Sequence, residues 1–220
     1  MICHVAERAC RARGIDRVIV ATDDERIAAA VRGTGAEVEM TRADHPTGTD
    51  RLAEVAERVS ADVIVNVQGD LPLLDPAMIE RLVDRMFADP GLPMATLATP
   101  LRDQAAWRSP HVVKVVVDGA GQALYFSRAP IPADRVEPPA GEPLGWQHIG
   151  LYAYRRDTLL RLAALPRTPL ERRERLEQLR ALEHGIAIGV EAWESPELVI
   201  EVDVPEDLRR AEAALGGRST

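Results

Sequence analysis

The fold of this chain is decided by the stretch DVIVNVQGD, residues 62–70, together with the helix signal that follows it. The apolar run is typical of a strand buried in a sheet, and the glycine lets the chain turn so that Asp70 stands at the strand end. Asp75 and Pro76 then form a helix start, a capping acid followed by proline at the first helical position. We expect a helix from Asp75 to about residue 88 and a returning strand at 94–98.

The same alternation extends toward the N-terminus. Strands are expected at 17–22 and 37–40, and helices at 24–31 and 49–59. Strands and helices that alternate in this way, with continuous apolar strands, predict an α/β fold with a mainly parallel central sheet covered by helices.

The pattern changes after Pro100. Two apolar runs, 112–117 and 122–127, flank the turn sequence DGAG and predict a β-hairpin. We interpret the region of about 110–156 as a hairpin dimerisation arm on a single domain that covers 1–220. The remaining predicted elements are a proline-rich loop at 129–143, strands at 149–154, 186–193 and 199–202, and helices at 170–184 and 205–215.

Composition limits the possible classes of protein. The chain has 220 residues and is 46% hydrophobic, which is enough for a full core and excludes intrinsic disorder. No apolar run approaches the roughly 18 residues of a membrane helix, and the N-terminus does not resemble a signal peptide, so we expect a cytoplasmic protein without membrane insertion. The net charge of −8 argues against a nucleic-acid partner.

Acidic residues follow two of the predicted strands. Asp70 comes after the strand at 62–68, and Asp203 comes after the strand at 199–202. Ligands of open α/β sheets gather at the carboxyl ends of strands, and Mg²⁺ commonly takes one or two carboxylates plus substrate phosphates. Two converging strand ends would make a magnesium site. The alternative for each aspartate alone is a turn or cap residue.

A segment rich in hydrogen-bonding groups, MTRADHPTGTDR at 40–51, joins a predicted strand to a predicted helix. Thr47 or Thr49 could cap that helix, and the helix N-terminus would then offer backbone amides to an anion or a base edge. The alternative is an ordinary loop with an N-cap.

Six segments carry a wider resemblance: MTRADHPTGT (40–49), NVQGD (66–70), ALYFSR (123–128), HIGLY (148–152), LEQLR (176–180) and VDVPEDL (202–208). Their order and spacing resemble the 3-deoxy-manno-octulosonate cytidylyltransferase family over essentially the whole chain. The resemblance implies an enzyme that joins CTP to the acid sugar 3-deoxy-manno-octulosonate (Kdo), giving CMP-Kdo and pyrophosphate for lipopolysaccharide biosynthesis. It also implies a nucleotide-diphospho-sugar transferase fold, a homodimer and dependence on Mg²⁺.

The resemblance implies roles for individual residues as well. Asp70 and Asp203 would be the catalytic metal ligands. Around the cytidine would lie Arg42, Asp44, Thr47, Gly48 and Gln68, and the acid-sugar side would be lined by Arg128, His148, Tyr152, Glu177 and Gln178. The alternatives are a structural salt bridge for Arg128 and a core position for His148.

The chain departs from the family at its start. A first strand and an arginine-, glycine- and lysine-containing loop that grips the triphosphate precede the first helix in the family, and both are absent before Met1. We consider a misplaced start, a truncated and impaired nucleotide-sugar-binding protein, or a cytidylyltransferase for another acid sugar such as sialic acid. Without the loop's charge-assisted hydrogen bonds, each worth roughly 1.5–3 kcal/mol, we expect these 220 residues to make CMP-Kdo poorly.

Overall fold

The computed structural model describes residues 1–133, 135, 141–195, 200, 202 and 205–216. Its N-terminal half consists of α1 (Ile2–Ala9), β1 (Ile19–Thr22), α2 (Glu25–Val31), β2 (Glu37–Met40), α3 (Gly48–Arg58), β3 (Val63–Asn66), α4 (Pro76–Ala88) and β4 (Met94–Leu101). The rest consists of α5 (Gln104–Arg108), β5 (Lys114–Val117), β6 (Ala123–Ser127), β7 (Gly145–Arg155), α6 (Arg156–Ala164), α7 (Pro169–Glu174), α8 (Gln178–Glu183), β8 (Ile188–Ala192) and α9 (Pro205–Gly216).

The helix starts that the sequence predicts are confirmed by their caps. The Asp75 carboxylate accepts a hydrogen bond from the Ala77 amide at the start of α4, with Pro76 in the first turn. Asp24 caps α2 through the Arg26 amide. Each cap satisfies an amide that has no partner within its helix, so short-range chemistry fixes where these helices begin.

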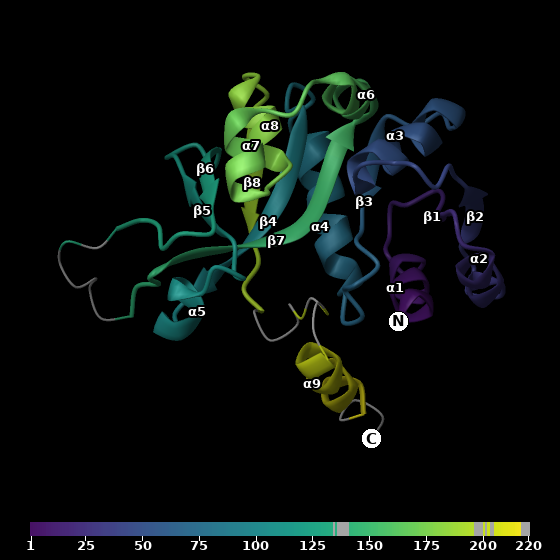
Figure 1. Cartoon of the computed structure of the whole chain (residues 1–220), viewed down its shortest axis with the longest axis horizontal. Coiled ribbons are helices and arrows are strands. Elements are labelled where there is room, and N and C mark those ends of the chain that lie inside the picture. Colours follow the sequence, from purple (N-terminus) through teal and green to yellow (C-terminus); the bar gives the residue numbers. More distant parts are fainter. Residues whose placement is uncertain (134, 136–140, 196–199, 201, 203–204, 217–220) are drawn as a thin grey trace.

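The strands form two sheets in the described part of the chain (Figure 1). β1 and β2 pair in parallel as a small sheet of their own. In the larger sheet the order is β6-β5-β7-β4-β8, and β3 pairs with β7. In Figure 1, α1 and the β1–α2–β2 unit lie at one end of the molecule, and the β5–β6 hairpin and α5 lie at the other.

The predicted α/β fold with a helix-covered sheet is confirmed, but the large sheet is mixed rather than mainly parallel. The long strand β7 runs antiparallel to β3, to β4 and to β5. Among the strands that the structure describes, only β4 and β8 pair in parallel within this sheet. The reason is that β7 separates β3 from β4, two strands that run in the same direction and would otherwise be parallel neighbours.

The predicted hairpin is present, but it is part of the sheet. β5 and β6 pair antiparallel, with a register irregularity after Val116, and β5 also pairs with β7. Lys114, the only lysine in the chain, is fully buried on β5. Its ammonium group donates to the backbone oxygens of Ser109, Val112 and Arg128 at 2.8, 2.6 and 2.5 Å, so it joins the strand to two neighbouring loops.

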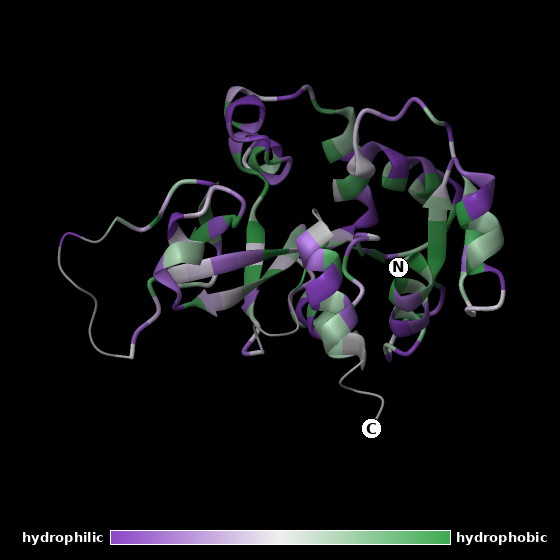
Figure 2. Ribbon diagram, turned by 60° about the horizontal axis from the view of Figure 1, so that its bottom comes forward, coloured by the Kyte–Doolittle hydropathy of each residue, from purple (hydrophilic) through white to green (hydrophobic). Residues whose placement is uncertain are grey.

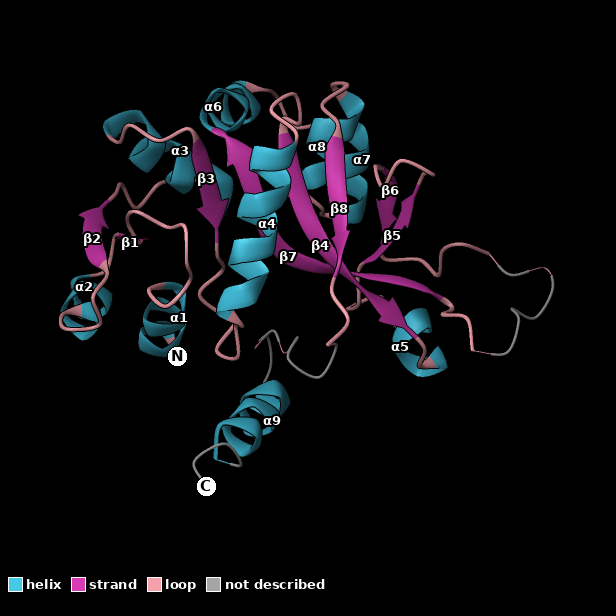
Figure 3. Ribbon diagram, turned by 180° about the vertical axis from the view of Figure 1, so that it is seen from behind, coloured by secondary structure: helices cyan, strands magenta, loops and turns pink. Residues whose placement is uncertain are grey.

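Apolar clusters lie on both faces of the large sheet. One gathers side chains of α1 and α4 with β4 and β7, and the other gathers β5, β6, α6 and α8 with the opposite face. Figure 3 shows α4 lying across the back of the sheet, and Figure 2 shows that the surface helices carry both hydrophilic and hydrophobic residues. No helix among the described residues has the length and apolarity to cross a bilayer.

The predicted helix at 170–184 is interrupted. Arg175 has a left-handed backbone conformation (φ 55°, ψ 48°) and separates α7 from α8. A capping box of Thr168 and Glu171 fixes the start of α7. The sequence of 170–184 is typical of one continuous charged helix. It therefore did not indicate the turn at Arg175. The predicted strand at 199–202 falls partly outside the described residues, and no strand is assigned at 200 or 202.

Candidate active site

A cavity of about 710 Å³ opens between α3, β7 and the α7–α8 turn. Seven of the predicted site residues line it: Gly48, Gln68, Arg128, His148, Tyr152, Glu177 and Gln178. Strand β7 contributes one face, because His148, Gly150, Tyr152 and Tyr154 alternate with residues that point the other way. The structure thus brings together residues of both the predicted cytidine side and the predicted acid-sugar side.

The N-terminus of α3 faces this cavity. Thr47 is the N-cap, and its hydroxyl accepts a hydrogen bond from the Asp50 amide at 3.3 Å, which confirms one of the two predicted caps. Thr49 has a different role, because its hydroxyl donates to the Glu177 carboxylate at 2.6 Å. This contact joins segments that are 128 residues apart and holds the helix start against the α7–α8 turn.

His148 is both a core residue and a lining residue. It is only 8% exposed, packs edge-on against Phe126 with ring centroids 5.1 Å apart, and lies 5.3 Å from the Tyr152 ring. Burial lowers the pKa of His148 to about 3, since the imidazolium would lose its hydration. The imidazole is therefore neutral near pH 7 and offers one donor and one acceptor.

Arg128 is held by backbone oxygens, and it forms no salt bridge with the carboxylates that the structure describes. Its Nε donates to the Glu174 backbone oxygen and its Nη1 to the Pro110 backbone oxygen, both at 2.9 Å. The Glu174 carboxylate in turn accepts from the Arg128 amide at 3.0 Å and from the Ser127 hydroxyl at 2.8 Å. The guanidinium is thus fixed where Arg128 lines the cavity.

The remaining predicted cytidine residues lie on the loop before α3, outside the lining of the cavity. The side chains of Arg42 and Asp44 are 70% and 80% exposed. The loop is anchored from inside by Glu54, whose carboxylate accepts from the Arg42 amide at 3.2 Å and contacts His45 and Arg58. The hydrogen bond from His45 holds the pKa of Glu54 below its usual value.

Of the two predicted metal ligands, Asp70 is half-buried after β3, and Asp203 lies outside the described residues. The amide of Val202, which precedes Asp203 in sequence, donates to the Asp70 backbone oxygen at 3.0 Å. Among the described residues, no three or more His, Cys, Asp or Glu side chains gather at metal-binding distance. The chain at Asp70 and at Val202 is therefore joined by a backbone hydrogen bond, and the assignment of Asp70 and Asp203 as metal ligands stays a prediction.

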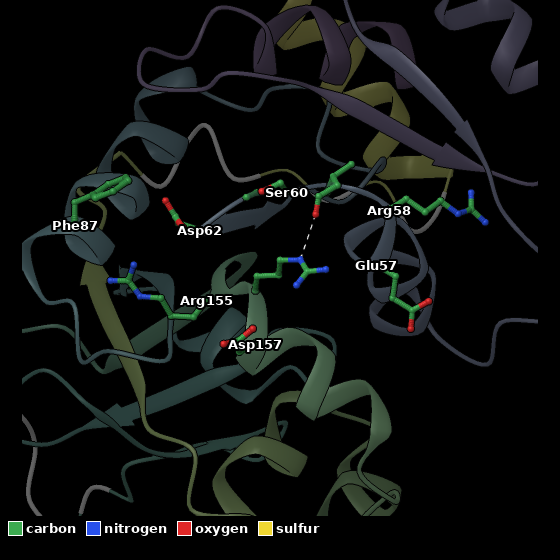
Figure 4. Close-up of a pocket in the computed structure, with 10 residues that line it drawn as sticks. Glu57, Arg58, Ser60, Asp62, Phe87, Arg155 and Asp157 are labelled. Carbon is green, nitrogen blue, oxygen red and sulfur yellow. Dashed lines mark hydrogen bonds between the residues drawn. The ribbon is translucent and has the colours of Figure 1, made fainter.

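A second cavity of about 740 Å³ lies at the other end of β3 (Figure 4). Charged side chains of both signs line it, among them Arg58, Asp62, Arg155 and Asp157. Arg155 donates to a backbone oxygen at the C-terminal end of α4, and Arg156 to one at the C-terminal end of α3. Both side chains thus satisfy carbonyl groups that have no partner within their helix. No predicted site residue lies there, and we assign the active site to the first cavity.

Sequence reasoning missed several lining residues, namely Thr49, Asn66, His111, Tyr154, Arg175, Asp207 and Arg210. For two of them, the sequence contained a pattern that could have identified them. Asn66 begins the motif that ends at Asp70, and Tyr154 follows Tyr152 at the strand period of two. Asn66 also hydrogen-bonds to the Tyr154 hydroxyl, and burial raises the pKa of Tyr154 so that it stays protonated. No sequence pattern could have identified Arg175, because its position depends on the turn between α7 and α8.

Comparison with known proteins points to one family. The sequence profile of the family described as cytidylyltransferase matches residues 1–188. The 3-deoxy-manno-octulosonate cytidylyltransferase of Syntrophotalea carbinolica is 57% identical over 99% of this chain and 88% of its own length. The enzyme of the same name from Geobacter sulfurreducens is 51% identical over 96% of this chain and 86% of its own length.

Solved structures agree. A structure of CMP:2-keto-3-deoxy-manno-octonic acid synthetase complexed with CTP matches with a TM-score of 0.88 and 43% identity, over 98% of this chain and 87% of that one. A 4-diphosphocytidyl-2C-methyl-D-erythritol synthase from Anaerococcus prevotii, at 13% identity and a TM-score of 0.63, shares the fold alone. The chain thus belongs to the cytidylyltransferase family and, within it, to the 3-deoxy-manno-octulosonate cytidylyltransferases.

Proposed function

We propose that this protein transfers CMP from CTP to the anomeric hydroxyl of Kdo, with release of pyrophosphate. One observation carries the proposal: a single cavity joins the α3 N-terminus and Gln68 to Arg128, His148 and the α7–α8 turn. Gly48 and Gln68 of the predicted nucleotide side thus face the same space as the predicted sugar side. This arrangement suits the relatives' names, a cytidylyltransferase for 3-deoxy-manno-octulosonate and a synthetase complexed with CTP.

Each side of the cavity supplies what one substrate needs. The backbone amides at the start of α3 suit an anion or a base edge, since they have no partners within the helix. Arg128 brings a fixed positive charge to the sugar carboxylate, and Glu177 and Gln178 offer groups that can hydrogen-bond to hydroxyls. The sugar oxygen attacks the α-phosphorus of CTP in line, so these residues act mainly by holding the two reactants in position.

Mg²⁺ fits the residues around Asp70. We propose that Asp70 and Asp203 hold it, because the ion usually binds one or two carboxylates together with substrate phosphates and does not need a complete protein cage. When bound, it would neutralise charge on the phosphate oxygens. The hydrogen bond from Val202 to the Asp70 backbone oxygen supports the pairing of these two chain segments.

Pyrophosphate release in the presence of CTP, Mg²⁺ and Kdo tests the function, with sialic acid as the competing acceptor. We expect release with Kdo, at the low rate expected for these 220 residues, and none with sialic acid. Asp70→Asn should abolish turnover, whereas Asp62→Asn, at the other end of β3, should leave it unchanged. Equal release with both sugars would contradict the assigned acceptor, and full activity of Asp70→Asn would contradict the metal site.

We further propose that the protein is a cytoplasmic homodimer. The β5–β6 hairpin supports the oligomeric state, because β6 is the outer strand of the sheet order and Leu124 on it is 62% exposed. Two-fold dimers are the commonest assemblies of soluble proteins. Sedimentation of Leu124→Glu beside the unchanged protein tests this, and a monomer in both samples would contradict it.

A further inference from the structure

Thr96 is a buried hydroxyl in the middle of the large sheet, next to the active-site histidine. It lies on β4 at 0% exposure, opposite Tyr152 of β7 and at a point where the register of the two strands shifts. Its Oγ1 lies 3.1 Å from His148 Nε2, 2.8 Å from the Leu151 oxygen and 3.2 Å from the Ile149 oxygen. Three polar atoms thus surround one hydroxyl that has a single proton.

The proton of this hydroxyl can be placed from the contacts alone. A carbonyl oxygen never donates, so the contacts of 2.8 Å to the Leu151 oxygen and 3.2 Å to the Ile149 oxygen direct the single Thr96 proton to these carbonyls, of which Leu151 is the nearer. The proton is then not available to His148. The remaining contact, from His148 Nε2, is a hydrogen bond only if the imidazole carries its proton on Nε2.

His148 has one proton to place, because burial keeps the ring neutral. With that proton on Nε2, Nδ1 is left as an acceptor. Among the described residues, no group hydrogen-bonds to His148 Nδ1, and the side chain lines the cavity. An acceptor nitrogen at this place suits a hydroxyl donor, and the acid sugar is the substrate with several hydroxyl groups.

We propose that Thr96 is a positioning residue that holds His148 in the Nε2–H tautomer, so that Nδ1 accepts a hydrogen bond from a hydroxyl of the acid sugar. The inference rests on the proposed function for the identity of the hydroxyl donor. The tautomer itself rests only on the contacts within the sheet.

The chain offers a matched control on the same strand. Thr99 is also on β4 and 1% exposed, but within the described residues its hydroxyl has no hydrogen-bond partner. Thr96→Val and Thr99→Val therefore make the same chemical change at two buried positions, and only the first removes a hydrogen bond to His148. Thr96→Ser keeps the hydroxyl and should behave as the unchanged protein.

The experiment combines nitrogen NMR of histidine-labelled protein at neutral pH with steady-state kinetics. The His148 signals are assigned from their loss in His148→Asn. We expect the unchanged protein and the variants Thr96→Ser and Thr99→Val to show the Nε2–H tautomer. Thr96→Val should show a mixture of tautomers, with KM for Kdo raised about fivefold, as the loss of one hydrogen bond predicts, and KM for CTP unchanged.

Three outcomes would overturn the inference: a proton on Nδ1 in the unchanged protein, an unaltered tautomer and KM in Thr96→Val, or the same changes in Thr99→Val. Circular dichroism confirms that each variant is folded before it is compared. If the unchanged protein releases no pyrophosphate from CTP and Kdo, the hydrogen bond from a sugar hydroxyl to Nδ1 is overturned together with the proposed function. The nitrogen signals test the role of Thr96 in fixing the tautomer independently of activity.

Discussion

The loop before α3 and the predicted sugar side of the cavity are built from different kinds of contact. The loop, part of the predicted nucleotide side, lies outside the cavity lining and carries the largely exposed charges of Arg42 and Asp44. On the predicted sugar side, His148 and Gln178 are 8% and 7% exposed, and Arg128 is fixed by backbone oxygens. The first region presents charged groups to solvent, and the second holds polar groups within the core.

This difference predicts how much substitutions in each region lower the stability of the protein. Exposed ion pairs contribute little to stability, because water and salt screen them. A buried polar group that loses its partner costs much more, since nothing replaces the lost hydrogen bonds. Substitutions that disturb the sugar side should therefore lower the stability of the whole protein, whereas those on the nucleotide side should change substrate binding with little effect on stability.

The largest expected effect is on the ion pair behind the α7–α8 turn. Arg180 donates to Glu171 through Nε and Nη2, at 2.9 and 2.5 Å, and both side chains are at most 5% exposed. Arg180→Met removes the buried partner of Glu171 and leaves it only the Thr168 amide at 3.2 Å and half-exposed Arg167 at 3.8 Å, so we expect a loss of about 3 kcal/mol in the free energy of unfolding. Urea unfolding measures it.

A matched control for this prediction is the pair of Arg17 and Glu37, which has the same two-bond geometry at 2.8 and 2.7 Å. Its side chains are 47% and 51% exposed. Arg17→Met should leave the unfolding midpoint nearly unchanged. Equal losses in the two variants would show that burial does not distinguish the two regions.

The next effect is the dependence of stability on pH. The pKa of His148 is about 3 in the folded protein, against 6.5 for the unperturbed side chain. Between these values the unfolded chain binds a proton that the folded protein does not, so stability falls as the pH is lowered from 6.5 toward 3. This one group contributes a loss of about 1.4 kcal/mol per pH unit.

Urea unfolding at several pH values checks this prediction in the unchanged protein and in His148→Asn, which should show a shallower dependence. The nucleotide side differs, because the lowered pKa of Glu54 keeps that carboxylate ionised until the pH falls below its usual value of 4.5. Identical slopes in the two proteins would contradict the burial of a neutral His148.

The smallest effect is expected at Glu54. Glu54→Gln weakens the contacts to the Arg42 amide, His45 and Arg58, so the loop before α3 loses its anchor. We expect KM for CTP to rise about fivefold, as for one lost hydrogen bond, while KM for Kdo stays unchanged. A rise in KM for Kdo instead would show that the two sides are not separable.

Much of the site could be predicted from the sequence, because its residues lie in short motifs whose order is readable. Gln68 follows a strand, Thr47 starts a helix, and His148 and Tyr152 share the period of one strand. The roles of all these residues remain predictions, and Arg42 and Asp44 lie outside the cavity lining. Arg175 was missed because a left-handed residue between two helices interrupts no sequence pattern.

The sequence by itself determined the individual elements and the family, because caps, turns and apolar periods act over a few residues. Asp75 and Pro76 start α4 in any context that allows a helix. Only the tertiary structure decided that β7 lies antiparallel between β3 and β4, that Thr49 contacts Glu177, and that Thr96 contacts His148. These pairings join residues that are 44 (Leu101 and Gly145) to 128 (Thr49 and Glu177) positions apart. Their partners are selected by burial and by the need to satisfy each polar group, which no local pattern contains.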